Sequence, residues 1–304
     1  MAGLCEGRVV IVTGAGRGIG RGHALEFARQ GAKVVVNDLG GALDGSGAST
    51  LTPAQSVAEE IRALGREAIA NGDDVSDWNG AERLVRSAVE TFGGLDVLVN
   101  NAGILRDRML FNMTIEEWDS VIRVHLRGTF CPTRHAAAYW RERAKNGKPN
   151  QARVINTTSV SGLYGNAGQS NYGAAKAGIG AFTVIVAKEL ERFGVTVNAV
   201  SPGARTRMTE NLRPGAAAVP DEGFDPRSAD NIAPIAVWLG SLDSGDVTGR
   251  VFEVMGGRLC LSEGWTRGPE TERDRRWDPA ELGPVVRDLL RKARPAEPMS
   301  RPRP

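Results

Sequence analysis

Short runs of β-branched residues alternate with longer amphipathic stretches along most of the chain. Nearly unbroken Val and Ile runs indicate strands that are buried on both faces, as in a parallel sheet covered by helices. The runs read RVVIVTG, KVVVND, EAIANGDD, LDVLVNNAG, ARVINTTS, VTVNAVSPG and GRVFEVMGG. Helices are predicted between them over Ile19–Gln30, Ala81–Phe92 and Glu116–Trp140. The alternation predicts an α/β fold, a doubly wound (Rossmann) parallel sheet of about seven strands with helices on both faces.

The 304 residues could form one large domain or two small ones. No internal repeat or break divides the first 260 residues, so we expect a single dinucleotide-binding catalytic domain over residues 1–261. From Ser262 the chain becomes charged and Pro-punctuated, which predicts a C-terminal extension over 262–304 with one helix at Pro279–Lys292 and a frayed end. This extension is either a surface arm or a segment that packs on a partner subunit.

Composition excludes several classes of protein. A hydrophobic content of 41% and a charged content of 24% are ordinary for a soluble globular protein, and a net charge of +2 with dispersed basic residues disfavours a nucleic-acid partner. No export signal and no membrane-spanning apolar run are evident. The three cysteines are scattered, which suits a reduced compartment and gives no metal-ligand spacing. We therefore expect a cytoplasmic protein without a metal and without a membrane partner.

A glycine-rich turn follows the first predicted strand. The stretch VVIVTGAGRGIGRG places Gly14, Gly18 and Gly20 where that strand meets the first helix. Glycine there permits a tight turn and lets the backbone approach a pyrophosphate, which the helix N-terminus attracts. The turn therefore predicts a dinucleotide site, to which Arg17 and Ile19 also belong.

The tip of the second strand indicates which dinucleotide is bound. Asp38 can accept hydrogen bonds from both adenosine ribose hydroxyls and would repel a 2′-phosphate, which favours NAD over NADP. Arg17 is the contrary signal, because a guanidinium in the turn could pair with that phosphate. Asp74 and Val75 follow the third strand and are expected to border the adenine, although Asp74 could instead cap the next helix. We expect the cofactor to be NAD.

Several motifs resemble those of the short-chain dehydrogenase/reductase family from about Gly7 to Gly257. They are TGAGRGIG, NNAG at Asn100–Gly103, Ser159 followed by YGAAK at Tyr172–Lys176, and SPG at Ser201–Gly203. A second set is similar to the (3R)-hydroxyacyl-CoA dehydrogenase unit of peroxisomal multifunctional enzyme type 2. It consists of VVVNDLGG, NNAGILRDR, RVHLRGTF, GLYGNAGQSNY and RMT.

The resemblance implies hydride transfer between a nicotinamide ring and a carbonyl or hydroxyl carbon. It assigns Tyr172 as the general acid/base, whose usual pKa of about 10 is too high for a base at neutral pH. Lys176, four residues on, shares a helix face with it and would supply an ammonium that favours the phenolate and binds the nicotinamide ribose. Ser159 would hold the substrate oxygen. His125 replaces the Asn of many members; it could relay a proton between Lys176 and solvent, or be a core histidine bonded to a backbone carbonyl.

The resemblance also implies further cofactor contacts. These lie at Asn100, Asn101, Ala102 and Gly103, and then at Pro202, Gly203 and Thr206 beside the nicotinamide carboxamide. Residues 207–226, rich in Gly, Ala and Pro, are expected to form a mobile substrate lid. The two helices Glu116–Trp140 and Tyr172–Phe193 are expected to pair with their copies around a two-fold axis, giving a homodimer or a homotetramer.

The leading functional hypothesis is an NAD-dependent dehydrogenase of a 3-hydroxyacyl-CoA or a similarly bulky alcohol such as a hydroxysteroid. One alternative is an NADPH-dependent 3-oxoacyl thioester reductase, which Asp38 disfavours. The other is a catalytically silent dinucleotide-binding sensor or scaffold. That alternative predicts the loss of Ser159, Tyr172 or Lys176, and all three are present.

Overall fold

The fold was analysed in a computed structural model of the full chain. The structure describes all residues except 1–2, 42–43, 45–51, 207–218, 221–222 and 299–304. Most of the expected lid over 207–226 and the last residues of the extension therefore lie outside the described part of the chain.

One sheet in the order β3-β2-β1-β4-β5-β6-β7-β8 forms the centre of the molecule. The strands are β1 Val9–Thr13, β2 Lys33–Asn37, β3 Ala68–Asn71, β4 Val97–Asn100, β5 Ala152–Thr157, β6 Val195–Pro202, β7 Val251–Met255 and β8 Arg258–Ser262. The first seven are parallel, as expected, and β8 pairs antiparallel with β7. The α/β Rossmann fold is thus confirmed, with an eighth strand at one edge within the described residues.

The eighth strand arises from a two-residue turn. Gly256 has a φ of +57°, which an L side chain rarely adopts, so the chain reverses directly after β7. The predicted domain boundary after residue 261 falls one residue before the end of β8. Residues assigned to the extension therefore begin at the edge of the sheet.

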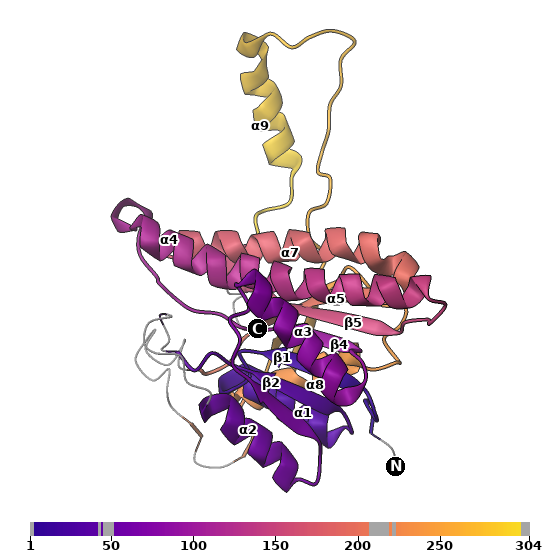
Figure 1. The fold of residues 1–304 in the computed structure, drawn as a ribbon. Coiled ribbons are helices and arrows are strands. Elements are labelled where there is room, and N and C mark those ends of the chain that lie inside the picture. The colour runs from indigo at the N-terminus through magenta and orange to yellow at the C-terminus, as the bar shows by residue number, and fades with distance from the viewer. Residues whose placement is uncertain (1–2, 42–43, 45–51, 207–218, 221–222, 299–304) are drawn as a thin grey trace.

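Helices cover both faces of the sheet (Figure 1). One layer contains α1 Gly18–Arg29, α2 Thr52–Ala63 and α8 Ala233–Gly240; the other contains α3 Trp78–Phe92, α4 Ile115–Ile122, α5 Gly128–Lys145 and α7 Ser170–Leu190. A short helix, α6 Val160–Leu163, follows β5. No helix among the described residues is both long and apolar enough to cross a membrane.

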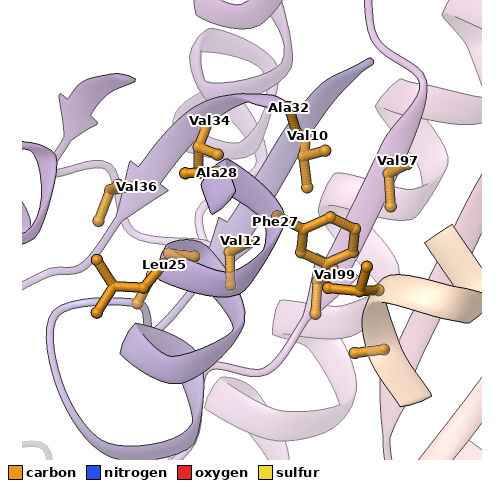
Figure 2. Packing of buried hydrophobic residues seen from close by; sticks show 14 of the residues in the cluster. Val10, Val12, Leu25, Phe27, Ala28, Ala32, Val34, Val36, Val97 and Val99 are labelled. Atoms are coloured by element: carbon orange, nitrogen blue, oxygen red, sulfur yellow. The ribbon is translucent and has the colours of Figure 1, made fainter. Parts of the chain in front are cut away.

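Each face of the sheet has its own hydrophobic cluster, because successive strand residues point to opposite sides. Val10 and Val12 pack beneath α1, whereas Val9 and Ile11 face the opposite layer. Figure 2 shows the ring of Phe27 lying among the valines of the first cluster. This ring is fully buried and contacts α8 so closely that a Cβ added to Gly240 would lie 2.5 Å from it.

The helix expected over Glu116–Trp140 is interrupted. A π-helical turn over Arg123–Arg127 separates α4 from α5 and contains the buried His125. Such wide turns place side chains at functional sites more often than regular helix does. The sequence does not predict this π-helical turn, because apolar residues continue at helical spacing through it.

The C-terminal extension projects from the sheet edge. A 3₁₀ turn over Pro279–Glu281 leads into α9 Leu282–Lys292, which together match the expected helix at Pro279–Lys292. Figure 1 shows α9 standing beyond α7, apart from both helical layers. No residue of α9 is buried.

The Phe27 contact gives a test of the core. Phe27→Ala should lower the free energy of unfolding by about 3–5 kcal/mol, because it leaves a cavity beneath α1 and α8. Leu64→Ala, at a side chain that is 50% exposed, should change it by no more than about 0.5 kcal/mol. Urea denaturation at one protomer concentration measures both values; equal losses would show that the ring is not a core contact.

Candidate active site

A cavity of about 450 Å³ runs along the carboxyl ends of the strands on the β1–β4 side of the sheet. Its described lining contains most of the predicted cofactor contacts: Gly14, Arg17, Gly18, Ile19, Gly20, Asp38, Asp74, Val75, Asn101, Ala102, Gly103 and Thr206. That lining does not include the predicted cofactor contacts Tyr172, Lys176, Pro202 and Gly203. Gly203 instead packs against β7, where an added Cβ would lie 3.1 Å from Met255.

The glycine turn has the geometry that a pyrophosphate requires. Gly14 and Gly18 have φ values of +63° and +53°, in the region that favours glycine. A Cβ on Gly14 would lie 2.7 Å from the Cα of Ala102, and one on Gly20 would lie 2.1 Å from the carbonyl oxygen of Gly14. Only glycine fits this approach of β1, α1 and the end of β4, and the turn delivers the N-terminus of α1 to the cavity.

Asp38 lies at the tip of β2 and is held by the backbone. The Gly16 N–H donates to its Oδ2 at 2.8 Å, and the Gly40 N–H donates to its Oδ1 at 2.7 Å. Each oxygen keeps a lone pair for another donor, so the carboxylate can still accept from a pair of hydroxyls. These residues fit the adenosine half of a nicotinamide dinucleotide.

Asp74 does not cap the next helix. Asp77 caps α3, whereas Asp74 accepts bonds from Ser76 and pairs with Arg123, whose Nη2 lies 2.5 Å from Oδ2. Burial opposes ionisation of Asp74, but the Ser76 bonds and the Arg123 charge outweigh it and lower its pKa. Arg123, from the π-helical turn, also lines the cavity and was not predicted from the sequence.

The two asparagines of NNAG tie neighbouring strands together. Asn100 donates through Nδ2 to Asn156 in β5 and to Thr133 in α5, both at 2.9 Å. Asn101 donates to the carbonyl oxygen of Thr13 at 2.9 Å and so joins β4 to the end of β1. The cavity wall is therefore fixed on both sides of β4.

The catalytic candidates lie where β5, α6 and α7 meet. Ser159 caps α6 by accepting from the Ser161 N–H, and its side chain also lowers the pKa of the neighbouring Tyr172. Lys176, one turn along α7, places Nζ 5.6 Å from the Tyr172 ring centroid and donates to the Thr157 carbonyl at 2.6 Å. The three side chains predicted from separate motifs are thus adjacent.

Burial governs the ionisation of this cluster. It raises the pKa of Tyr172 to about 12, where the Asp107 carboxylate adds to the increase and the Ser159 bond opposes it. It also lowers the pKa of Lys176 to about 7. The expectation that the Lys176 ammonium brings Tyr172 toward a phenolate is therefore not met by the protein alone, since desolvation disfavours both charged forms.

His125 is a buried neutral histidine. Its Nε2 lies 2.8 Å from the carbonyl oxygen and 3.1 Å from the nitrogen of Ile104, and its ring packs edge-on against Tyr172 at 5.1 Å. Burial and the Lys176 charge lower its pKa to about 3. The ring also explains Gly103, because an added Cβ would lie 2.3 Å from His125 Cε1. This geometry is the core alternative of the sequence analysis, and a relay through His125 stays a prediction.

Two further side chains shape the site and were not predicted. Gln169 donates to Asp107 at 2.7 Å and accepts from Ser161 at 2.7 Å. Asn171 accepts from the Tyr172 N–H at 2.7 Å and donates to the carbonyl oxygens of Arg106 and Glu117. Both lie in the GQSNY segment just before Tyr172. Their closeness to the tyrosine in the sequence is the feature that could have identified them as site residues.

The sequence profile described as short chain dehydrogenase matches residues 8–217. The chain belongs to the short-chain dehydrogenase family. It is 45% identical to hydroxyacyl-CoA dehydrogenase ChsB1 of Mycobacterium tuberculosis over 296 residues, covering 94% of this chain and 89% of that protein. It is 43% identical to mouse (Mus musculus) peroxisomal multifunctional enzyme type 2 over 252 residues, which are 83% of this chain but only 32% of that enzyme.

Solved structures of family members have the same fold. A short chain dehydrogenase from Mycobacterium avium is 57% identical with a TM-score of 0.88, covering 97% of this chain and 99% of its own. One from Burkholderia cenocepacia, determined in complex with NADP, is 31% identical with a TM-score of 0.70, covering 83% of this chain and 98% of its own. This short-chain dehydrogenase therefore has one relative named as a hydroxyacyl-CoA dehydrogenase and another that was solved in complex with NADP.

Removal of the Tyr172 hydroxyl should nearly abolish turnover. Tyr172→Phe keeps the ring and its contact with His125, so cofactor binding should persist while kcat falls by about 10²–10⁴-fold. Tyr139→Phe, at a tyrosine of α5, is the matched control and should retain activity. Residual activity in Tyr172→Phe above about a tenth of the wild-type value would contradict the assignment.

The pH profile should respond in opposite directions to two substitutions. With Tyr172 as the predicted base, alcohol oxidation needs its phenolate, so the rate should rise with pH until the tyrosine is deprotonated. Lys176→Met removes the positive charge that Lys176 carries below its pKa of about 7, and should shift the part of the rise that lies below that pH to higher pH. Asp107→Asn removes a charge that raises the tyrosine pKa and should move it to lower pH. If the two variants shift the rise in rate in the same direction, or if neither shifts it, Tyr172 does not control the pH–rate profile.

Proposed function

We propose that this short-chain dehydrogenase is an NAD-dependent oxidoreductase of a 3-hydroxyacyl-CoA or a similarly bulky secondary alcohol. The observation that carries the proposal is the grouping of Ser159, Tyr172 and Lys176, which adjoins through His125 a cavity lined by the glycine turn and Asp38. The likeness to hydroxyacyl-CoA dehydrogenases supports the substrate class.

The roles follow from the geometry. Ser159 orients the substrate oxygen toward Tyr172, and Tyr172 takes the hydroxyl proton in oxidation or returns it in reduction. Lys176 holds the end of β5 through Thr157 and keeps positive charge beside the tyrosine below its own pKa of about 7. Bound oxidised nicotinamide supplies the hydride acceptor and a further positive charge that favours the phenolate. Asn101 and Gly103 hold the cavity wall between these groups and the glycine turn.

The preference for NAD rests on Asp38. Its carboxylate, at the tip of β2, would accept a hydrogen bond from the adenosine 2′-hydroxyl of NAD and would repel the 2′-phosphate of NADP. The alternative is an NADPH-dependent 3-oxoacyl thioester reductase. One observation favours it, because Arg17, which could pair with a 2′-phosphate, lines the same cavity as Asp38. The three free cysteines support a reduced compartment, and we propose the cytoplasm.

We also infer that the protein is a homodimer or a homotetramer. The outward face of α7 is apolar and small, with Ala174, Ala177, Ala181 and Ile185 exposed, and Phe130 of α5 is exposed as well. Such a face permits close helix–helix contact around a two-fold axis. Light scattering of the intact chain at micromolar concentration should show a dimer or tetramer, and a monomer would overturn the inference.

Cofactor preference provides the direct test. The wild type should oxidise 3-hydroxyacyl-CoA or hydroxysteroid substrates with a higher kcat/KM for NAD than for NADP. Asp38→Ala should narrow that ratio by about tenfold, which corresponds to about 1.4 kcal/mol of lost discrimination. Asp246→Ala changes the net charge equally at an exposed position outside the cavity lining and should leave the ratio unchanged. A wild-type preference for NADP would instead make Arg17 the phosphate-binding residue.

A further inference from the structure

An exposed apolar patch lies at the start of α4. It consists of Met109, Leu110, Phe111 and Ile115, of which Phe111 is 80% and Ile115 63% exposed. We call these four residues the α4 patch. Large apolar side chains gathered in this way on a surface mark a binding site more often than single exposed ones.

The α4 patch adjoins the catalytic region. The Arg108 N–H, next to Met109, donates to the Gly168 carbonyl at 2.8 Å, and Gln169 follows in the segment that leads into Tyr172. Met109 itself contacts this segment, since a Cβ on Gly168 would lie 3.8 Å from its Sδ. Whatever covers the patch therefore lies beside the segment that holds Asp107 and Tyr172.

A second uncovered apolar face lies on α9. Leu282, Val286 and Leu290 recur every four residues and are exposed along one side of this helix. An isolated helix of 11 residues is marginal in water and is normally stabilised by packing of its apolar face. Figure 1 shows α9 held away from the sheet and from α4 of its own chain.

The segment before α9 is ordered by its own contacts. Arg273 stacks on Trp277 at 4.0 Å, and both Arg273 and Arg275 pair with Glu281, at 2.6 and 2.9 Å. Residues 263–272 connect β8 to this unit and, at roughly 3.3 Å per residue, can span on the order of 33 Å. The unit is thus preformed and can reach across a neighbouring protomer.

The charges beside the two apolar faces are complementary. Arg287 and Arg291 follow Val286 and Leu290 directly and flank the stripe of α9. Glu116 and Asp119, both exposed on α4, flank Ile115. Arg291 also pairs with Asp288 of its own helix, and Arg108, next to Met109, pairs with Glu117. The complementary charges are therefore those of Arg287 beside the stripe of α9 and of Glu116 and Asp119 beside the α4 patch.

We propose that α9 of one copy of this chain docks on the α4 patch of a second copy. Helix α7 packs against α4, and α9 stands beyond α7 (Figure 1), so a second copy seated on α7 would lie beside α9. The interface thereby extends from α7 to the segment beside Tyr172. This goes beyond the proposed activity, because it assigns the C-terminal extension to the partner's active-site entrance.

Cross-linking between chains tests the contact. In a Cys260→Ser background, Phe111→Cys in one tagged chain and Leu290→Cys in a differently tagged chain are mixed and oxidised as full-length proteins. The remaining cysteines, Cys5 and Cys131, are buried. A disulfide that joins the two tags is expected. Leu64→Cys in place of Phe111→Cys, at an exposed site after α2, should give at least about tenfold less inter-chain disulfide, as expected where geometry forbids simultaneous contact.

Two results would overturn the docking proposal. One is a disulfide that forms only within single chains carrying both Phe111→Cys and Leu290→Cys. The other is an inter-chain yield no higher than that of the Leu64→Cys control. The proposed activity would stand in either case, since it is measured separately by turnover.

A charge exchange gives a second measurement. Glu116→Lys with Asp119→Lys should weaken self-association several-fold in sedimentation equilibrium, and Arg287→Glu with Arg291→Glu in the same chain should restore it. Unchanged cofactor binding confirms that each variant is folded. Two outcomes would contradict the proposed contact. Either the α4 substitutions leave self-association unchanged, or the α9 substitutions fail to restore it.

Discussion

A buried chain of polar side chains links the sheet to the helix that carries the catalytic candidates. Asn100 donates to Asn156, and Asn156 donates to Thr183 at 2.9 Å, while Thr133 accepts from Asn100. All four side chains are almost completely buried. Each group left without a partner there would cost about 1–3 kcal/mol, so the chain fixes how β4, β5, α5 and α7 meet. The relative positions of NNAG, Ser159 and Tyr172 depend on this network.

Much of the molecule could be predicted from local sequence. The Val and Ile runs specify parallel strands because burial on both faces requires them, and the glycines at 14, 18 and 20 specify a turn that no side chain fits. Ser159, Tyr172 and Lys176 were found through spaced motifs, and the fold brings them together. These features share one property: the constraint on each residue arises from its immediate neighbours along the chain.

The features that sequence missed depend on contacts across the fold. β8 is the edge strand and pairs with β7 alone. Its sequence, RLCLS, is half-exposed and lacks the unbroken apolar run of the other strands. Arg123 acquires its role from Asp74, 49 positions away, and Asp107 influences Tyr172 from a separate loop. The effect of burial on the pKa values of Tyr172 and Lys176 depends on the fold in the same way. A four-residue spacing shows that two groups are close, but it does not show how thoroughly both lose contact with water.

Helix α7 contributes residues both to the candidate active site and to the exposed face on which we propose that a second copy packs. Tyr172 and Lys176 face the sheet, where Lys176 is buried and bonded to the end of β5. Ala174, Ala177 and Ala181 face outward, and their small side chains leave the backbone accessible to a neighbour. A partner helix packed on that face would touch none of the reacting groups, yet it would oppose any rotation of α7 that separates Tyr172 from Ser159. If Tyr172 transfers the proton as we propose, rigidity imposed from outside the protomer would act on that group through Ser159, whose interaction with Tyr172 lowers the tyrosine pKa.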